Sequence, residues 1–251
     1  MIEFEGLAKR YGSFQALAPL ELSIPRGEVF GFLGPNGAGK TTTIRLMMGI
    51  LVPSAGAVRI DSFDCHADGP EVKRRVGYLP DSPIFYDYLR GREILQFVGE
   101  MHGFSRTEAQ SRAEQLLAEL QLGDASEEFA VNYSMGMKKK LGLACALIHD
   151  PQTLILDEPT NGLDPRAAKD VQDRLRRSAA DGKTIFLSTH LLDMAERICT
   201  RVGIIHRGNL VATGSPEALR GQLAAGGSLE EVFLSATEEI GSAGQPAADG
   251  R

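Results

Sequence analysis

Gly34-Pro-Asn-Gly-Ala-Gly-Lys-Thr41 is the stretch that decides the fold of this chain. It satisfies the pattern GxxxxGK(S/T), follows the short apolar run Val29–Leu33 and precedes the helical pattern of Thr42–Ile50. A strand, a glycine-rich turn and a helix in this order surround an anion with backbone amides and a helix N-terminus. A glycine-rich turn without a ligand would match the same letters, but the flanking strand and helix favour a phosphate site.

The chemistry of that loop assigns roles to its residues. Lys40 would place its charge on the β- and γ-phosphates, and Thr41 would offer its hydroxyl to magnesium. The other predicted nucleotide contacts in this stretch are Gly34, Asn36, Gly37, Ala38, Gly39 and Thr42.

Two acids end a second buried strand. Thr153–Leu156 is followed at once by Asp157 and Glu158, and such a strand presents its carboxylates at the ligand edge of a parallel sheet. We expect Asp157 to hold magnesium and Glu158 to orient or deprotonate the water that attacks the γ-phosphate. An N-cap ahead of Pro159 is the alternative, and the upstream phosphate loop favours the catalytic interpretation.

A histidine closes the next strand. Thr184–Ser188 runs into Thr189 and His190, which brings the imidazole to the same sheet edge. A lone histidine is more often structural, but the strand order favours a catalytic place beside the γ-phosphate.

The alternation of short apolar runs with helical patterns indicates an α/β fold on a mainly parallel sheet. Three shorter pieces, Ile2–Phe4, Leu20–Ile24 and Ala57–Ile60, indicate an N-terminal antiparallel β layer. From Ser82 to Asp150 the apolar period changes to 3.6, which predicts an inserted helical subdomain.

Helix boundaries are also marked. Ser105 and Glu108 predict a capping box, and Asp164 and Pro165 predict the start of a helix that runs to about Ala180. Two apolar stripes should face the interior of the helical subdomain: Ile94, Phe97, Val98 and Met101 on one, and Ala113, Leu116, Leu117 and Leu120 on the other.

Composition limits the classes of partner. The 251 residues carry a formal net charge of −6, which argues against nucleic acid because neutralising phosphates needs surplus Lys and Arg. Cys65, Cys145 and Cys199 lack metal-ligand spacing and fit reduced cytosolic thiols. Apolar runs fall short of the roughly 18 to 20 residues that cross a bilayer, and the N-terminus lacks a signal-like segment. We expect a cytoplasmic protein whose pore, if it serves transport, belongs to another chain.

Together these motifs resemble those of one family. The loop at 34–41 (Walker A), the acidic strand at 153–158 (Walker B), Asn161-Gly-Leu-Asp164 and Ser188-Thr-His190 resemble the ATPases of ABC transporters over nearly the whole chain. The resemblance implies a P-loop NTPase core that uses ATP and Mg²⁺.

Tyr133-Ser-Met-Gly-Met-Lys-Lys-Lys140 resembles the LSGGQ signature of that family. The resemblance implies a head-to-tail homodimer, or a dimer with a related subunit, in which each ATP lies between one phosphate loop and the other subunit's signature. Ser134 and Gly136 would then face the partner's γ-phosphate, and Asp164 would communicate between the two sites. Tyr11 matches the aromatic that stacks on adenine.

Several residues depart from the family pattern. Asp81 stands where a glutamine usually follows Gly-Tyr-Leu-Pro, and it can ligate magnesium but cannot donate an amide hydrogen bond. We count Asp81 among both the catalytic and the metal-binding candidates. Met135 and Met137 replace a glycine and the glutamine of the signature, and Cys145 replaces a frequent arginine, which predicts slower catalysis. We expect Lys138–Lys140 to be a solvated helix face.

The predicted organisation is one cassette. Its parts are a nucleotide-binding core at 1–81 and 151–214, a helical subdomain at 82–150, and a C-terminal helical extension at 215–236, followed by a disordered tail at 237–251.

The resemblance implies a motor on the cytoplasmic face of the membrane that drives a separate permease. Phe85-Tyr-Asp-Tyr88 lies where relatives dock the permease, although these aromatics could equally be core residues. Ser228–Leu234 resembles the C-terminal segment of the branch that exports drugs, antibiotics and lipids. A non-transport ABC ATPase on ribosomes or nucleic acid is the alternative, but it usually carries tandem cassettes or a long insert. A kinase or GTPase would leave Tyr133–Ala144 unexplained.

Overall fold

The computed structural model describes residues 1–221 and 228–234 of the chain. A six-stranded sheet of order β10-β9-β3-β8-β7-β6 lies at its centre. The three middle strands, β3 (Val29–Leu33), β8 (Thr184–Thr189) and β7 (Thr153–Asp157), pair in parallel and are buried along their whole length, as strands covered on both faces must be. The predicted α/β fold with a mainly parallel sheet is confirmed.

The outer strands of this sheet were not predicted from the sequence. β6 (Val76–Leu79) and β9 (Arg201–His206) extend it in parallel, and β10 (Asn209–Gly214) pairs with β9 in the antiparallel sense. β6 has only four residues, and β10 has no buried residue. The shortness of β6 and the exposure of β10 explain why neither was recognised as a buried central strand.

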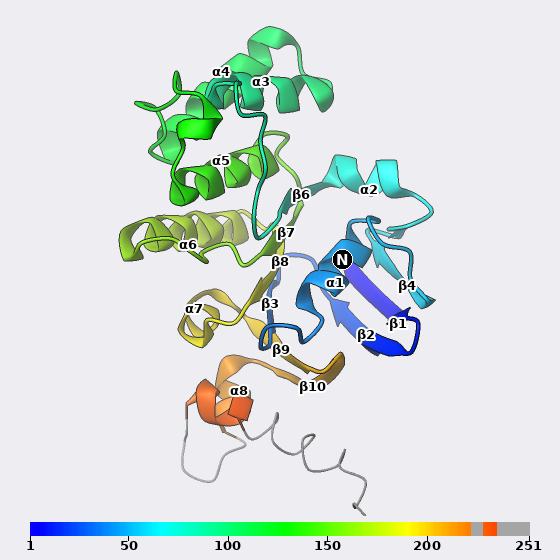
Figure 1. The fold of residues 1–251 in the computed structure, drawn as a ribbon. Coiled ribbons are helices and arrows are strands. Elements are labelled where there is room, and N and C mark those ends of the chain that lie inside the picture. Colours follow the sequence, from blue (N-terminus) through cyan, green and yellow to red (C-terminus); the bar gives the residue numbers. More distant parts are fainter. Residues whose placement is uncertain (222–227, 235–251) are drawn as a thin grey trace, which may run out of the picture.

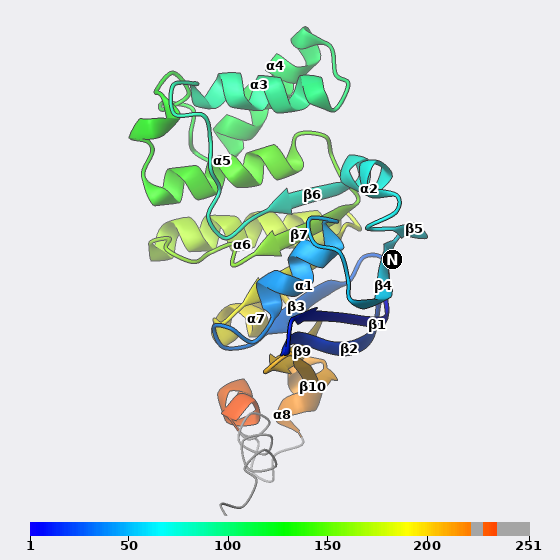
Figure 2. The ribbon, with the colours of Figure 1, turned by 45° about the vertical axis from the view of Figure 1, so that its right-hand side comes forward.

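The N-terminal antiparallel layer is confirmed, but its strands are longer than the apolar pieces indicated. β1 (Ile2–Tyr11), β2 (Phe14–Ile24), β4 (Ala55–Ile60) and β5 (Phe63–Asp64) form a sheet of order β2-β1-β4-β5. Figure 2 shows helix α1 (Lys40–Met47) beside this layer and the central sheet. The strands extend further because β1 pairs with both neighbours, which fixes polar positions that alternation alone does not reveal.

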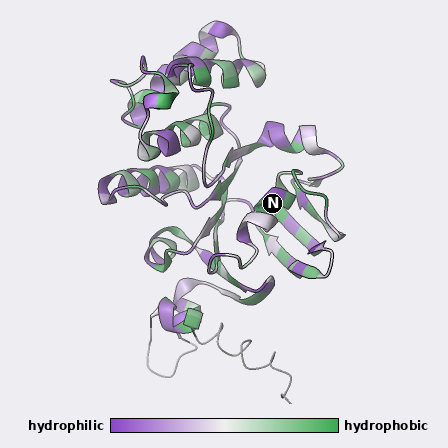
Figure 3. Cartoon of the chain, in the orientation of Figure 1, coloured by the Kyte–Doolittle hydropathy of each residue, from purple (hydrophilic) through white to green (hydrophobic). Residues whose placement is uncertain are grey.

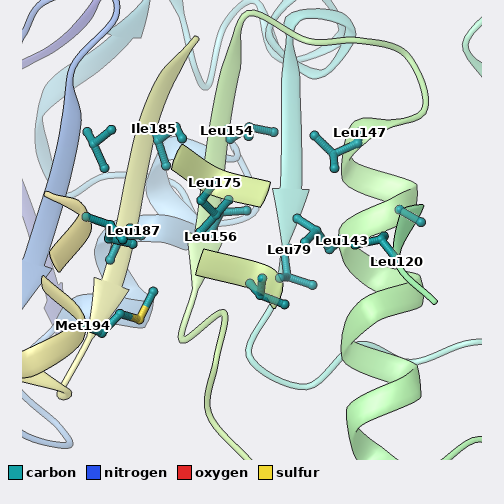
Figure 4. Close-up of a cluster of buried hydrophobic side chains, with 14 of the residues drawn as sticks. Leu79, Leu120, Leu143, Leu147, Leu154, Leu156, Leu175, Ile185, Leu187 and Met194 are labelled. Atoms are coloured by element: carbon teal, nitrogen blue, oxygen red, sulfur yellow. The ribbon is translucent and has the colours of Figure 1, made fainter. Parts of the chain in front are cut away.

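Three helices form the subdomain at the top of Figure 1: α3 (Gly91–Met101), α4 (Arg106–Glu119) and α5 (Met135–Leu147). The predicted capping box opens α4, where the Ser105 hydroxyl accepts a hydrogen bond from the Glu108 amide at 3.3 Å. Figure 4 shows leucines of α5 opposite those of β6 and β7 in one apolar cluster. The subdomain therefore packs directly on the edge of the central sheet.

Two predictions about these helices are wrong. Phe97 and Met101 are 49% and 72% exposed, so the stripe on α3 does not face the interior along its whole length. Lys139 and Lys140 are 2% and 9% exposed, so the lysine run is not a solvated face. The α4 stripe is buried as expected: Ala113, Leu116, Leu117 and Leu120.

The remaining helices cover the sheet and its far end. α6 (Pro165–Ala180) begins at the predicted Asp164 cap, and α2 (Gly69–Arg75), α7 (Leu192–Ile198) and α8 (Pro216–Arg220) are shorter. Figure 3 shows hydrophobic and hydrophilic residues alternating along α6, as on a helix with one packed face.

The C-terminal segment is only partly described. Residues 229–234 are helical, and Leu229 and Val232 are buried in the same core as the central sheet. The predicted tail at 237–251 lies outside the described residues. No helix in the described ranges has the length and apolar character needed to cross a membrane.

Candidate active site

The phosphate-loop motif forms a tight turn between β3 and α1. Gly37 and Gly39 have φ values of 79° and 113°, a backbone region that favours glycine. A β-carbon on Gly39 would lie 2.7 Å from the Ala16 carbonyl oxygen. No side chain caps α1 at Gly39, so the first-turn amides of α1 can bind an anion.

Lys40 is held at this turn. Its side chain is 6% exposed, and Nζ donates to the Gly34 carbonyl at 2.7 Å. Nζ also lies 3.3 Å from Oε1 of Glu158. The ammonium is therefore pre-positioned between the loop and the end of β7.

A cavity of about 660 Å³ opens beside the loop. Ten residues predicted from the sequence line it, drawn from the phosphate loop, β1, the loop after β6 and the ends of β7 and β8. They are Tyr11, Asn36, Gly37, Gly39, Lys40, Thr41, Thr42, Asp81, Glu158 and His190.

Glu158 is one of the polar residues that line this cavity. Its φ of 47° is unusual for a residue with a β-carbon, and such strain is concentrated at functional sites. The backbone amide donates to the Ser188 carbonyl at 3.1 Å, and Oε2 lies 3.0 Å from Nδ1 of His190. With Lys40 on the other oxygen, two basic groups fix the orientation of the carboxylate.

Asp157, which precedes Glu158 in the chain, is buried and does not line the cavity. It is 1% exposed, and the Ser188 hydroxyl donates a hydrogen bond to its Oδ1. Burial raises the pKa of Asp157, and the nearby carboxylates of Asp81 and Glu158 act in the same direction, whereas the hydroxyls of Ser188 and Thr41 lower it. A cation at this edge would relieve that cost, so these oxygen donors fit magnesium.

Asp81 lies in the loop that follows β6. Its Oδ1 is 3.4 Å from Nζ of Lys139 and 3.4 Å from Nδ2 of Asn161. Lys139 also donates to the Asp81 backbone carbonyl, and burial lowers the pKa of Lys139. The Asp81 carboxylate is thus tied to α5 and to the loop after β7.

The far end of the cavity is aromatic. Tyr11 and Phe14 line it and are 47% and 63% exposed, and Lys9 Nζ lies 5.0 Å from the Tyr11 ring centre. Exposed flat rings at a cavity mouth can stack on a base.

The residues predicted to act in trans do not line the cavity. Ser134 caps α5 by accepting a hydrogen bond from the Met137 amide at 3.2 Å, and Gly136 lies in the first turn of that helix. Asp164 caps α6, with Oδ1 accepting from two backbone amides at 3.0 Å. These hydrogen bonds hold the pKa of Asp164 below its usual range, chiefly the one from the Ala167 amide.

The residues that line the cavity differ from the predicted set at individual positions. Gly34 and Ala38 are in the phosphate loop but do not line the cavity. Phe14 and Asn161 line it without having been predicted; Phe14 gave no motif signal, whereas Asn161 lies in a quoted motif. Lys139 was missed because a lysine run suggests solvent.

Comparison with known proteins decides the family. Residues 17–161 match the ABC transporter family. This chain belongs to that family. As a member, it is an ATP-binding cassette with ATPase chemistry.

Relatives and solved structures agree with this family. The daunorubicin resistance ATP-binding protein DrrA3 of Streptomyces coeruleorubidus is 36% identical, over 96% of this chain and 76% of that protein. The Nod factor export ATP-binding protein I of Paraburkholderia xenovorans is 40% identical, over 87% and 72%. A solved ATP-binding subunit of an ABC transporter is 35% identical with a TM-score of 0.86, over 94% of this chain and 99% of that chain. A dimeric bacterial cassette at 23% identity and a TM-score of 0.80, over 86% and 98%, shares the fold.

Proposed function

We propose that this chain binds and hydrolyses ATP as one half of a head-to-tail dimer and thereby drives export through a separate permease. One observation carries the proposal: Lys40, Thr41, Glu158 and His190 meet at one cavity that the signature residue Ser134 of the same chain does not line. The cavity has the phosphate-side groups of an ATPase, and the helix N-terminus at Ser134 remains for another copy's phosphate.

The bound nucleotide is oriented by this chain's own groups. The loop amides and Lys40 hold the phosphates, and Tyr11 stacks on the base. Thr41, Asp157 and Asp81 would hold Mg²⁺, which neutralises phosphate charge when bound. The Glu158 carboxylate accepts a proton from the attacking water, and His190, at 3.0 Å, keeps that carboxylate aimed.

Export is supported by the relatives, whose names include drug resistance and Nod factor export. We place the cassette, residues 1–236, on the cytoplasmic face of the membrane. Its permease contact would be the aromatic surface next to Asp81, where Tyr86 and Tyr88 are 72% and 82% exposed and Phe85 packs against the core. We therefore propose that Phe85 belongs to the core and that Tyr86 and Tyr88 contact the permease.

Mixed dimers test the shared site. In a Glu158→Gln background, Lys40→Ala removes the phosphate contact and Ser134→Glu places a carboxylate against the partner's γ-phosphate. Each variant alone should remain monomeric with ATP on size-exclusion chromatography. An equimolar mixture should form a dimer with one ATP, because one of its two sites has both Lys40 and Ser134. A mixture that stays monomeric, while the Glu158→Gln parent dimerises, would refute the head-to-tail arrangement.

A further inference from the structure

Lys139 is a buried charge that the proposed chemistry does not use. It belongs to α5, the helix that begins at Ser134, and its side chain is 3% exposed. Burying an ammonium is costly unless a partner compensates it. The partners of this one are the backbone carbonyl and the carboxylate of Asp81. The carboxylates of Asp157 and Glu158 also act on its charge.

The same face of α5 also packs against the Asp81 loop at a second point. Gly142 lies three residues after Lys139 and therefore on the same side of the helix. A β-carbon on Gly142 would lie 2.7 Å from Leu79 and 3.1 Å from Pro83, which lie two residues before and two residues after Asp81. Close packing and an ion pair between the buried Lys139 ammonium and the half-exposed Asp81 carboxylate thus fix this loop to α5.

We propose that Lys139 is a positioning residue for hydrolysis, which ties the Asp81 loop to α5 so that Asp81 at one nucleotide and Ser134 at the other move together. The inference rests on the proposed function, because Ser134 reaches a phosphate only in the shared dimer. Lys139 itself does not line the cavity. It fixes where the Asp81 carboxylate lies and transmits that position to the tip of α5.

Lys139→Met tests this role because methionine fills a similar volume without the charge. Removing an orienting partner of a metal-side carboxylate should lower kcat about tenfold. KM for ATP should stay the same within about twofold, because the phosphate loop is untouched. The melting temperature should hold or rise, because an apolar side chain replaces a buried ion. Unchanged kcat would overturn the proposal.

A matched control lies next in the sequence. Lys140 is also buried on α5, but its partner is Asp170 of α6 at 3.6 Å. Lys140→Met therefore removes a similar ion pair away from Asp81 and should leave kcat within about twofold. An equal loss of kcat in both variants would show that any buried lysine of α5 has this effect and would contradict the proposal.

Two further measurements separate this inference from the proposed function. In an Asp81→Ala background, Lys139→Met should cost much less kcat than in the wild type; an undiminished loss would show that Lys139 does not act through Asp81. Hydrogen exchange without nucleotide should accelerate at the amides of Asp81, Ser82 and Ile84 in Lys139→Met but not in Lys140→Met. If the wild type hydrolyses no ATP, the proposed function fails, and the exchange rates still decide whether Lys139 holds the loop.

Discussion

Two regions carry motifs of one family: the edge of the sheet at the carboxyl ends of β3, β7 and β8, and the tip of α5 at Ser134. They differ in how many elements of the chain contribute contacts to them. At the edge, Glu158 contacts both Lys40 and His190, which come from different parts of the chain. At the tip, the hydrogen bond described for the Ser134 side chain is with the Met137 amide of its own helix. The edge is a site assembled by the folding of one chain, whereas in the proposed dimer the tip binds its ligand only together with a second chain.

The two regions also differ in how their side chains are buried and paired. Buried groups at the edge are paired across elements, as in the ion pair of Lys40 and Glu158. At the tip, Met135 is 70% exposed, and its sulfur would lie 2.6 Å from a β-carbon on Gly162. The α5 tip therefore abuts the loop that leads to Asp164. We expect changes at the edge to alter ATP binding or hydrolysis, and the dimer only through the bound ATP, and changes at the tip to alter the dimer directly.

Glu158→Gln should have the largest effect. Losing the general base should lower kcat about a thousandfold, while the neutral amide keeps the shape that ATP requires. ATP should then accumulate on a stable dimer, seen by light scattering. A monomeric variant with full ATPase activity would break the contrast, because Glu158 would belong to neither chemistry nor assembly.

Lys40→Met should have the second-largest effect, which is the loss of tight ATP binding. Removing a charge-assisted contact to two phosphates should weaken ATP affinity about a hundredfold, measured by calorimetry. Lys183→Met is the matched control, because Lys183 is equally buried but bonds Pro151 and Asp150 away from the cavity. Equal affinity losses in both variants would mean that a folding defect, and not the phosphate contact, causes the effect.

Tyr11→Ala sharpens the account at the aromatic end. Loss of one stacking ring should weaken ATP affinity about tenfold, with kcat nearly unchanged because the ring is remote from Glu158. The same change at Phe14, which also lines the cavity, shows how the two rings share the base. No loss of affinity in either variant would remove the adenine assignment.

The smallest expected effect is on thermal stability without nucleotide, where Asp157→Asn should be stabilising. Because folding raises the pKa of Asp157, its ionised form is a net cost to stability above that pKa. The amide keeps an acceptor for Ser188, so the melting temperature at pH 7 should rise by about 2 to 4 °C. The gain should shrink as the pH falls through the raised pKa, since the wild type then takes up a proton. A lower melting temperature at pH 7 would contradict the burial argument.

Much of the edge could be predicted because its motifs combine local and topological signals. Gly34–Thr41 shows its turn in its glycines, and parallel strands must end at one edge, which brings Glu158 to Lys40. The burial of Lys139 could not be predicted, since it depends on Asp81, which is distant in sequence. β10 was missed although its partner β9 is adjacent in sequence, because no residue of β10 is buried. A lysine run looks solvated until the fold places Asp81 opposite one of its members.

The most direct measurement is the structure of the ATP-loaded Glu158→Gln protein. The account predicts that the Ser134 hydroxyl of one copy lies about 2.7 to 3.2 Å from a γ-phosphate oxygen held by Lys40 of the other. A structure in which every γ-phosphate is remote from both copies of Ser134 would contradict it.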